Sequence, residues 1–246
     1  MNQEKIPKII HYCWFGGKEK PKKVKQCIES WNKYLDGYEF MEWNEKNFDV
    51  NCNCYVAQAY KEKKYAYVSD YARIKALYEY GGIYMDTDVE VLKSYDDILN
   101  NNCILGFEEE NYIATSFMAV TPNHKLIKEF IDRYENLQFY NESGDLDLTT
   151  NVQRLTSILE NKGLVRNGLY QVIENDINIY PQEYFSPYDY GNCIYNNTEN
   201  TYCIHHFIVS WLPWTIKVKK VIKKFIIPII GKNNMNKIRS MLKNNT

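Results

Sequence analysis

The feature that most limits the fold of this chain is the alternation of strand-like and helix-like segments along its first two hundred residues. Runs rich in β-branched and aromatic residues, typical of strands, are separated by segments whose apolar residues recur at helical spacing. The length of 246 residues is sufficient for one substantial domain with a buried core. Such an alternation predicts an α/β layered domain, in which helices cover a sheet.

The pattern also places the individual elements. Strands are expected at residues 5–15, 38–43, 83–85, 103–107 and 116–120, with an extended continuation at 89–92. Helices are expected over residues 21–31, 55–80, 124–137 and 151–161, and residues 171–204 are expected to be loop-rich with short strands. We predict that these elements form one domain, residues 1–211, and that residues 212–246 form a separate tail.

The cysteine pattern and the polar start of the chain indicate a reducing compartment. Seven cysteines are scattered without a CxxC pair, which argues against a disulfide framework and against a zinc ribbon. The segment that begins Met1-Asn2-Gln3 lacks the apolar core of a signal peptide. The apolar run at residues 225–230 is far shorter than the ~20 residues of a membrane span. We therefore expect a cytoplasmic protein.

The charge of the chain is unevenly distributed. The formal net charge is −1, but no acidic residue follows Glu199, and nine of the 30 lysines and arginines do. Beyond Pro213, apolar residues at helical spacing share one face and lysines the other: Trp214, Val218, Val221, Ile222 and Phe225 against Lys217, Lys220, Lys223 and Lys224. Such a helix can lie in an anionic lipid interface, so we expect the tail to dock on the inner face of the cytoplasmic membrane. The alternative is that its apolar face packs on the protein's own body.

The sharpest local pattern is Gly81-Gly82-Ile83-Tyr84-Met85-Asp86-Thr87-Asp88. The two glycines end the preceding helix, and the short apolar strand delivers two carboxylates one residue apart. Such a pair can hold one divalent cation, and oxygen ligands suit Mg²⁺ or Mn²⁺. A nucleotide-sugar diphosphate is a poor leaving group until such a cation neutralises its charge. The alternative is an ordinary turn with two exposed aspartates.

Two further groups of polar residues suit the same chemistry. Asp70 and Arg73 lie three residues apart on the upstream helix and therefore on one face, where they could grip sugar hydroxyls and phosphate. The alternative is a simple intrahelical ion pair. Downstream, His205-His206 precede Ser210, and a histidine there could complete the coordination of a metal. The alternative is a buried strand histidine.

Several segments form a combination that is more specific than any of its parts. They are residues 6–17, Trp43-Asn44-Glu45, residues 67–73 and 78–88, and His205-His206-Phe207 with Ser210-Trp211. The combination resembles glycosyltransferase family 32 over residues 5–211, including the sugar-binding Asp-x-Asp region. One departure is Phe207, where the family often has tryptophan. The same pattern is more distantly similar to the catalytic domain of the large clostridial glucosylating toxins.

The resemblance implies a GT-A fold, which is a Rossmann-like mixed sheet flanked by helices, and transfer with retention of anomeric configuration. It implies that Trp14 stacks on the nucleotide base. It also implies that Asp70 and Arg73 hold the donor sugar and that Tyr84 lines the donor pocket. These residues form the donor side of the predicted site.

The resemblance also implies a set of metal ligands. Asp86 is expected to contact both the ribose and the metal, and Asp88 the metal directly. His206 and Ser210 are the candidates for the remaining metal contacts. Trp211 is expected to close over the diphosphate. The predicted cofactor is therefore Mn²⁺ or Mg²⁺.

The expected partners follow from the same resemblance. The donor is expected to be a UDP-hexose or a UDP-N-acetylhexosamine, and the acceptor is expected to be a glycan or a lipid-linked saccharide of surface polysaccharide (capsule) synthesis. No nucleic-acid partner is expected. We favour front-face attack, in which the protein supplies positioning and charge stabilisation. A double displacement would need a carboxylate beneath the anomeric carbon, which the sequence does not identify.

Two other classes of protein share some of these sequence features. The segment Ile83–Val89 also fits the first motif of haloacid-dehalogenase-like phosphatases. That motif normally opens the fold, whereas here 82 residues precede it, and Asp96-Asp97 follows too closely to be the distant acidic pair. A non-catalytic carbohydrate-binding module would account for the aromatic residues but not for the clustered metal-type ligands.

Overall fold

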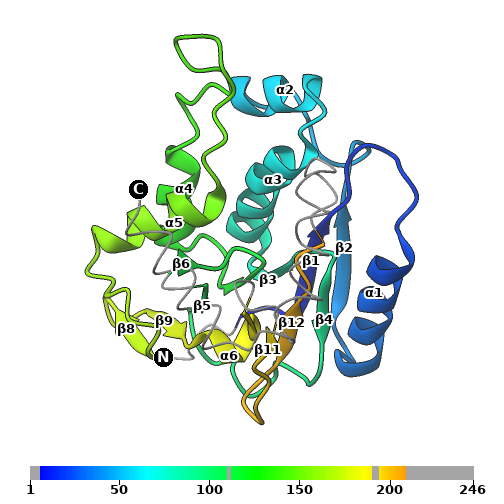
Figure 1. Cartoon of the computed structure of the whole chain (residues 1–246), viewed down its shortest axis with the longest axis vertical. Coiled ribbons are helices and arrows are strands. Elements are labelled where there is room, and N and C mark those ends of the chain that lie inside the picture. The colour runs from blue at the N-terminus through cyan, green and yellow to red at the C-terminus, as the bar shows by residue number, and fades with distance from the viewer. Residues whose placement is uncertain (1–5, 110–111, 190–193, 209–246) are drawn as a thin grey trace, which may run out of the picture.

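The central element of the protein is a mixed β-sheet. A computed structural model describes residues 6–109, 112–189 and 194–208. Within them, the main sheet has the strand order β2-β1-β3-β7-β5-β9-β8, and β6 pairs with β5 (Figure 1). Its strands are β1 (Ile9–Cys13), β2 (Glu39–Trp43), β3 (Gly82–Met85), β5 (Cys103–Glu108), β6 (Tyr112–Ile113), β7 (Phe117–Val120), β8 (Gln171–Ile173) and β9 (Ile177–Tyr180).

The direction of the strands determines which ends share an edge. Strands β1, β2 and β3 are parallel to one another. Strand β7 is antiparallel to both β3 and β5, so β3 and β5 run in the same direction on either side of it. The carboxyl ends of β1, β3 and β5 therefore lie at one edge of the sheet.

Helices cover the sheet, and each face has its own apolar core. One core contains side chains of α2 (Cys54–Lys61), α3 (Tyr65–Tyr80), α4 (Lys125–Asp132) and α5 (Asn151–Glu160). The other contains Trp31 of α1 (Lys22–Tyr34) and Phe185 of α6 (Gln182–Phe185), together with a small second sheet. Figure 1 shows α1 on the opposite side of β1 from α3. The predicted α/β layering is thus confirmed.

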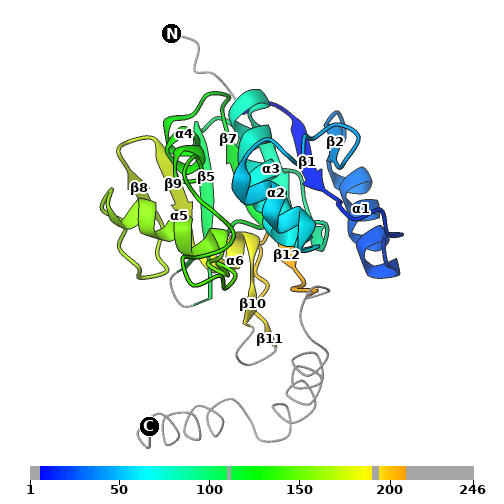
Figure 2. The same ribbon diagram turned by 90° about the horizontal axis from the view of Figure 1, so that it is seen from above.

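Two smaller sheets lie outside the main one. Strand β4 (Val89–Val91) pairs antiparallel with β12 (Cys203–His205). Strands β10 (Tyr188–Asp189) and β11 (Ile194–Tyr195) pair with each other and extend away from the main sheet (Figure 2). The pairing of β4 with β12 matters most for function, because it joins two segments that lie far apart in the sequence.

The predicted helix over residues 55–80 is divided into α2 and α3. Between them, Lys63 has a φ of 55°, a left-handed conformation that interrupts a helix. The sequence around it, residues 61–64, is Lys-Glu-Lys-Lys, so no apolar residue favours helix continuation there. The side chain of Asn53 accepts a hydrogen bond from the Val56 amide and caps α2.

Gly81 and Gly82 connect α3 to β3 within two residues. Their φ angles are 64° and 91°, values that residues other than glycine rarely adopt. A Cβ atom on Gly82 would lie 2.6 Å from the carbonyl oxygen of Ile9, and one on Gly81 would lie 2.6 Å from Pro122. Gly82 is therefore required for the close approach of β3 to β1, and Gly81 for the approach of the turn to Pro122. This turn determines where Asp86 leaves the sheet.

No helix in the described ranges combines the length and the apolar character needed to cross a bilayer. The predicted domain boundary after residue 211 and the basic tail lie outside the described residues.

Candidate active site at the end of strand β3

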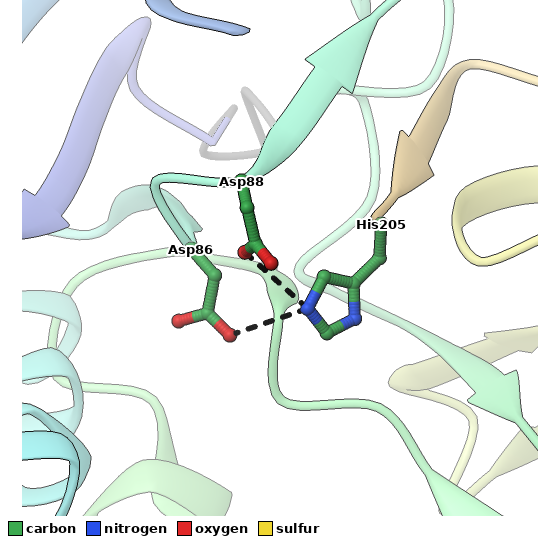
Figure 3. A group of neighbouring side chains, drawn as sticks. All are labelled: Asp86, Asp88 and His205. Carbon is green, nitrogen blue, oxygen red and sulfur yellow. Dashed lines mark ion pairs between the residues drawn. The ribbon is translucent and has the colours of Figure 1, made fainter. Parts of the chain in front are cut away.

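Asp86, Asp88 and His205 come together where β3 leaves the main sheet (Figure 3). The Asp86 amide donates to the carbonyl of Ser116 at 2.9 Å, and the Val89 amide donates to the Asp86 carbonyl at 3.0 Å. These bonds form a tight turn before β4. In the β4–β12 pair, His205 lies opposite Val89, so its ring lies next to the two aspartates.

The three side chains direct their ligand atoms at one another. His205 Nε2 lies 3.4 Å from Asp88 Oδ1 and 4.0 Å from Asp86 Oδ2. One ligand atom from each residue lies within 4.8 Å of the others. Two carboxylates and one imidazole in this arrangement are a donor set that a divalent cation accepts, and the mixture of oxygen and nitrogen suits Mn²⁺ better than Mg²⁺.

The protein holds the other oxygen of each carboxylate. Asp86 Oδ1 accepts a hydrogen bond from the Tyr84 hydroxyl at 2.9 Å and lies 3.3 Å from Arg73 Nη2. Asp88 Oδ2 accepts a hydrogen bond from the Ile208 amide at 2.6 Å. Each carboxylate is therefore oriented by one oxygen, while its other oxygen faces His205.

The acidic side chains of this site stabilise positive charge, as the pKa shifts of His205 and Asp88 indicate. Burial alone would lower the pKa of His205, but the carboxylates of Asp88, Asp86 and Glu108 outweigh it and raise that pKa to about 9. Burial alone would raise the pKa of Asp88, but the His205 charge and hydrogen bonds from His205 and Ile208 give it a net decrease. Without a metal, a proton on His205 neutralises part of the acidic charge, and a bound cation would replace that proton.

Arg73 connects Asp70 with Asp86 from inside the protein. Its Nη2 lies 2.9 Å from Asp70 Oδ1, and its Nη1 donates to the carbonyl of Thr115 at 2.6 Å. The guanidinium lies 4.4 Å from the centroid of the Tyr84 ring. Arg73 is buried, so its contacts are mostly with protein groups. Burial opposes its charge, but Asp86, Tyr84 and Asp70 raise its pKa above its usual range.

Asp70 remains the better candidate of this pair for contact with the donor sugar. Arg73 contacts its Oδ1 atom, and a hydrogen bond from the backbone of Asn151 also stabilises its charged form. Burial raises the pKa of Asp70 to about 6, although Arg73 opposes the increase. The predicted role of Asp70 in sugar binding stays a prediction. The structure gives Arg73 a supporting role, because it holds Asp70 and Asp86 in place.

The part of the chain that carries the two aspartates is similar to a known family. The family model described as "Glycosyltransferase sugar-binding region containing DXD motif" matches residues 21–105, which include Asp70, Arg73, Tyr84, Asp86 and Asp88. Over these 85 of its 246 residues, the chain is similar to the DXD glycosyltransferase family. The match includes the turn that presents both aspartates, and it favours a glycosyltransferase over the phosphatase and the binding module considered above.

The chain is also similar to individual proteins over different shares of its length. The chain is 26% identical to an uncharacterized glycosyltransferase of Acanthamoeba polyphaga mimivirus over 92% of each chain. It is 27% identical to inositol phosphoceramide mannosyltransferase 1 of Schizosaccharomyces pombe over 56% of this chain and 44% of that protein. The solved structure of PaToxG glycosyltransferase matches 65% of this chain and 71% of its own chain, with 20% identity and a TM-score of 0.49.

The structure places His205, rather than His206, beside the DXD aspartates. We predicted His206 as the metal ligand, but its Nε2 atom lies 2.7 Å from Glu90 Oε2, and its Nδ1 atom lies 3.1 Å from the Tyr195 hydroxyl. Glu90 also pairs with Lys23 of α1 at 3.0 Å. Neighbouring residues of a strand point to opposite sides, so one histidine faces the site and the other ties β12 to β4 and α1.

Replacing each histidine singly with alanine should distinguish the metal-binding role of His205 from the structural role of His206. We expect His205→Ala to weaken Mn²⁺ binding by at least about tenfold, since outer-shell changes alone cost this much at metal sites. His206→Ala should keep Mn²⁺ affinity within about threefold, while it lowers thermal stability because Glu90 loses a partner. Calorimetric Mn²⁺ titration and thermal melts of both variants provide the measurement. Equal Mn²⁺ affinities for the two variants would contradict the assignment.

The position of Trp14 is compatible with its predicted contact with the base. It directly follows β1, and because His11 of β1 lies opposite Tyr84 of β3, Trp14 leaves the sheet at the same edge as Asp86. It is partly exposed, and its indole N–H donates to the carbonyl of Lys18 at 2.6 Å. Ser210 and Trp211, predicted at the metal and the diphosphate, lie outside the described residues.

Sequence reasoning missed one acidic residue near the site. Glu108 ends β5, and burial raises the pKa of its carboxyl to about 7, with the charges of His205, Asp86 and Arg73 also acting on it. The only signal in the sequence was an acidic residue at the end of an apolar strand. That signal is weak, because which strand ends share an edge depends on the strand order of the sheet.

Proposed function

We propose that this glycosyltransferase has a GT-A fold, depends on Mn²⁺ and retains anomeric configuration. It would transfer a hexose or an N-acetylhexosamine from a UDP-sugar to a glycan or lipid-linked saccharide in surface polysaccharide synthesis. The observation that carries the proposal is that His205, from β12, converges on Asp86 and Asp88 of the DXD region. The mixed sheet, with the site beyond its carboxyl ends, supports the GT-A assignment.

Asp86, Asp88 and His205 would hold the cation. The cation supplies charge neutralisation at the diphosphate. The protein's own contribution is orientation, because Tyr84 and Arg73 hold Asp86, and the Ile208 amide holds Asp88. Such fixed dipoles and charges need no rearrangement during the reaction, which is where most of their stabilising effect originates. Asp70, which contacts the same Arg73 nitrogen as Asp86, would bind hydroxyls of the donor sugar.

The function is tested by a screen of nucleotide sugars. The full chain is incubated with UDP-glucose, UDP-galactose and their N-acetylamino forms, with Mn²⁺, with Mg²⁺ and with a chelator. We expect Mn²⁺-dependent release of UDP from at least one donor, and the anomeric configuration of a transferred sugar can then be determined by NMR. Binding without any release of UDP would favour a carbohydrate-binding module.

Replacement of Trp14 tests the predicted base contact. If the indole ring stacks on uracil, Trp14→Ala should weaken UDP and UDP-sugar binding alike by ~1–3 kcal/mol, the range for base–aromatic stacking. Because Trp14 is partly exposed, the stability loss should be smaller than the ~3–5 kcal/mol typical of a buried tryptophan. Calorimetric UDP titration of the folded variant measures the effect. Unaltered UDP affinity would rule out stacking.

The acceptor is proposed to be lipid-linked, with the enzyme held at the inner face of the cytoplasmic membrane. The fission-yeast relative is an inositol phosphoceramide mannosyltransferase, so at least one similar protein is named for a lipid acceptor. In this chain, the lysines after Glu199 and the apolar residues between them suit an anionic lipid surface. These features support peripheral docking of a cytoplasmic enzyme.

Membrane docking is tested by co-sedimentation with vesicles. The full chain and a chain that ends at Leu212 are mixed with anionic and with neutral vesicles at low salt. We expect only the full chain to sediment with anionic vesicles, because each nearby lysine adds ~1 kcal/mol of attraction. Equal and negligible sedimentation of both chains would mean that the tail has a structural role only.

A further inference from the structure

Glu108 lies at the same edge of the sheet as the DXD aspartates. Strands β3 and β5 run in the same direction on either side of β7, and Glu108 ends β5 just as Asp86 follows β3. Neighbouring strands are ~4.8 Å apart, so the two residues are separated across the edge by roughly 10 Å. Strand β7 and the residues before it lie between the two positions, so a sugar that contacted both side chains would lie beyond the edge of the sheet.

The alternation of side chains along β5 directs Glu108 toward β12. Residues 104, 106 and 108 share one face of the strand. Ile104 belongs to the core that contains Phe185, and a Cβ atom on Gly106 would lie 2.7 Å from the Phe185 ring. The Cys203 thiol, on β12, donates to the carbonyl of Phe185 at 3.3 Å. Glu108 therefore lies on the face of β5 that α6 and β12 cover, and His205 ends β12 on the same side.

The Glu108 carboxylate lacks the partners that its neighbours have. In the described ranges, Glu108 makes neither a hydrogen bond nor an ion pair through its side chain, whereas Asp86 and Asp88 are each held by protein donors. The residue is only partly exposed. Partly buried carboxylates normally have hydrogen-bond donors, so a ligand with hydroxyl groups is the natural source of them.

We infer that Glu108 faces the donor sugar and stabilises the positive charge that develops at its anomeric carbon. The inference rests on the proposed function. Glycosyl transfer passes through an oxocarbenium-like transition state, in which the bond to the leaving oxygen is largely broken before the new bond forms. A carboxylate fixed beside the ring stabilises that charge more than it stabilises the neutral sugar of the ground state. Glu108 is thus a catalytic residue that acts across the sugar from Asp86.

Glu108→Gln tests the inference, because it removes the charge and keeps the shape. We expect kcat for Mn²⁺-dependent release of UDP from the active donor to fall by at least about 100-fold, with KM changed by less than about threefold. Affinity for free UDP, which has no sugar, should be unchanged. Glu108→Asp should retain more activity than Glu108→Gln, since it keeps the charge. The matched control is Glu109→Gln, one residue away and exposed, which should behave as wild type.

The outcomes distinguish this inference from the proposed function. If wild-type protein releases UDP and Glu108→Gln does so at the same rate, the inference is overturned and the proposed function stands. If wild-type protein acts on no nucleotide sugar, the proposed function itself fails. A melting temperature of Glu108→Gln well below wild type, with activity lost in proportion to the unfolded fraction, would show a structural role and also overturn the inference.

Discussion

Asp88→Asn should abolish sugar transfer while it leaves the fold intact. The asparagine oxygen can still accept the hydrogen bond of the Ile208 amide, so the turn into β4 keeps its support. What is lost is the charge that faces His205 and the proposed cation. We expect turnover to fall by at least about 10²-fold, the usual cost of removing one stabilising group at a developing charge. Rates of UDP release over a range of Mn²⁺ concentrations measure the effect.

A surface variant provides the control for this experiment. Asp132 lies on the exposed side of α4, and Asp132→Asn makes the same chemical change away from the site. It should show wild-type turnover and melting temperature. Asp86→Asn should be as damaging as Asp88→Asn and should also weaken donor binding. Normal turnover and normal Mn²⁺ dependence in Asp88→Asn would refute the metal assignment.

Arg73→Ala should cause the largest loss of stability of any single change at the site. Arg73 lies between Asp70 and Asp86 and donates to the Thr115 carbonyl, all within the protein. Without Arg73, the neighbouring carboxylates of Asp70 and Asp86 lose the positive charge that they share. Loss of one partner from a buried ion pair typically costs ~3–5 kcal/mol, and we expect that decrease in the free energy of unfolding. Urea denaturation without divalent cations measures it.

The pH dependence of this loss gives an independent check. The pKa of Asp70 is already raised to about 6 by burial, and without Arg73 it should rise further. A raised carboxyl pKa means that the folded state binds a proton more tightly than the unfolded state, so stability falls as pH increases through that range. The difference between Arg73→Ala and wild type should therefore grow from pH 5 to pH 8. Arg133→Ala, on the surface after α4, is the control, and a pH-independent difference would contradict the explanation.

The sequence predicted those parts of the fold and site that depend on local patterns. The strand before Asp86, the helix that carries Asp70 and Arg73, and the turn at Gly81-Gly82 follow from residues close together in the chain. The break between α2 and α3 could not be predicted with the same certainty, because helical spacing continues on both sides of Lys63 and only the backbone conformation of that residue interrupts it.

The sequence could not decide questions that depend on long-range pairing. Whether His205 or His206 faces the aspartates is determined by the register of β12 against β4, and a shift of one residue would exchange them. The position of Glu108 depends on the strand order β3-β7-β5, in which neighbouring strands are not consecutive along the chain. In both cases the sequence shows the candidate residue but not which residues lie beside it in the fold.

The closure of β12 onto β4 has a consequence for how the enzyme matures. The Ile208 amide and the His205 ring reach Asp88 across about 120 positions of the chain. A cation held by Asp86, Asp88 and His205 would then act as a reversible cross-link, and a cross-link that closes so long a loop restricts the unfolded chain strongly. A partly synthesised chain that lacks β12 has no such site. Cation capture would thus become a late checkpoint, which only a chain that already includes β12 can pass.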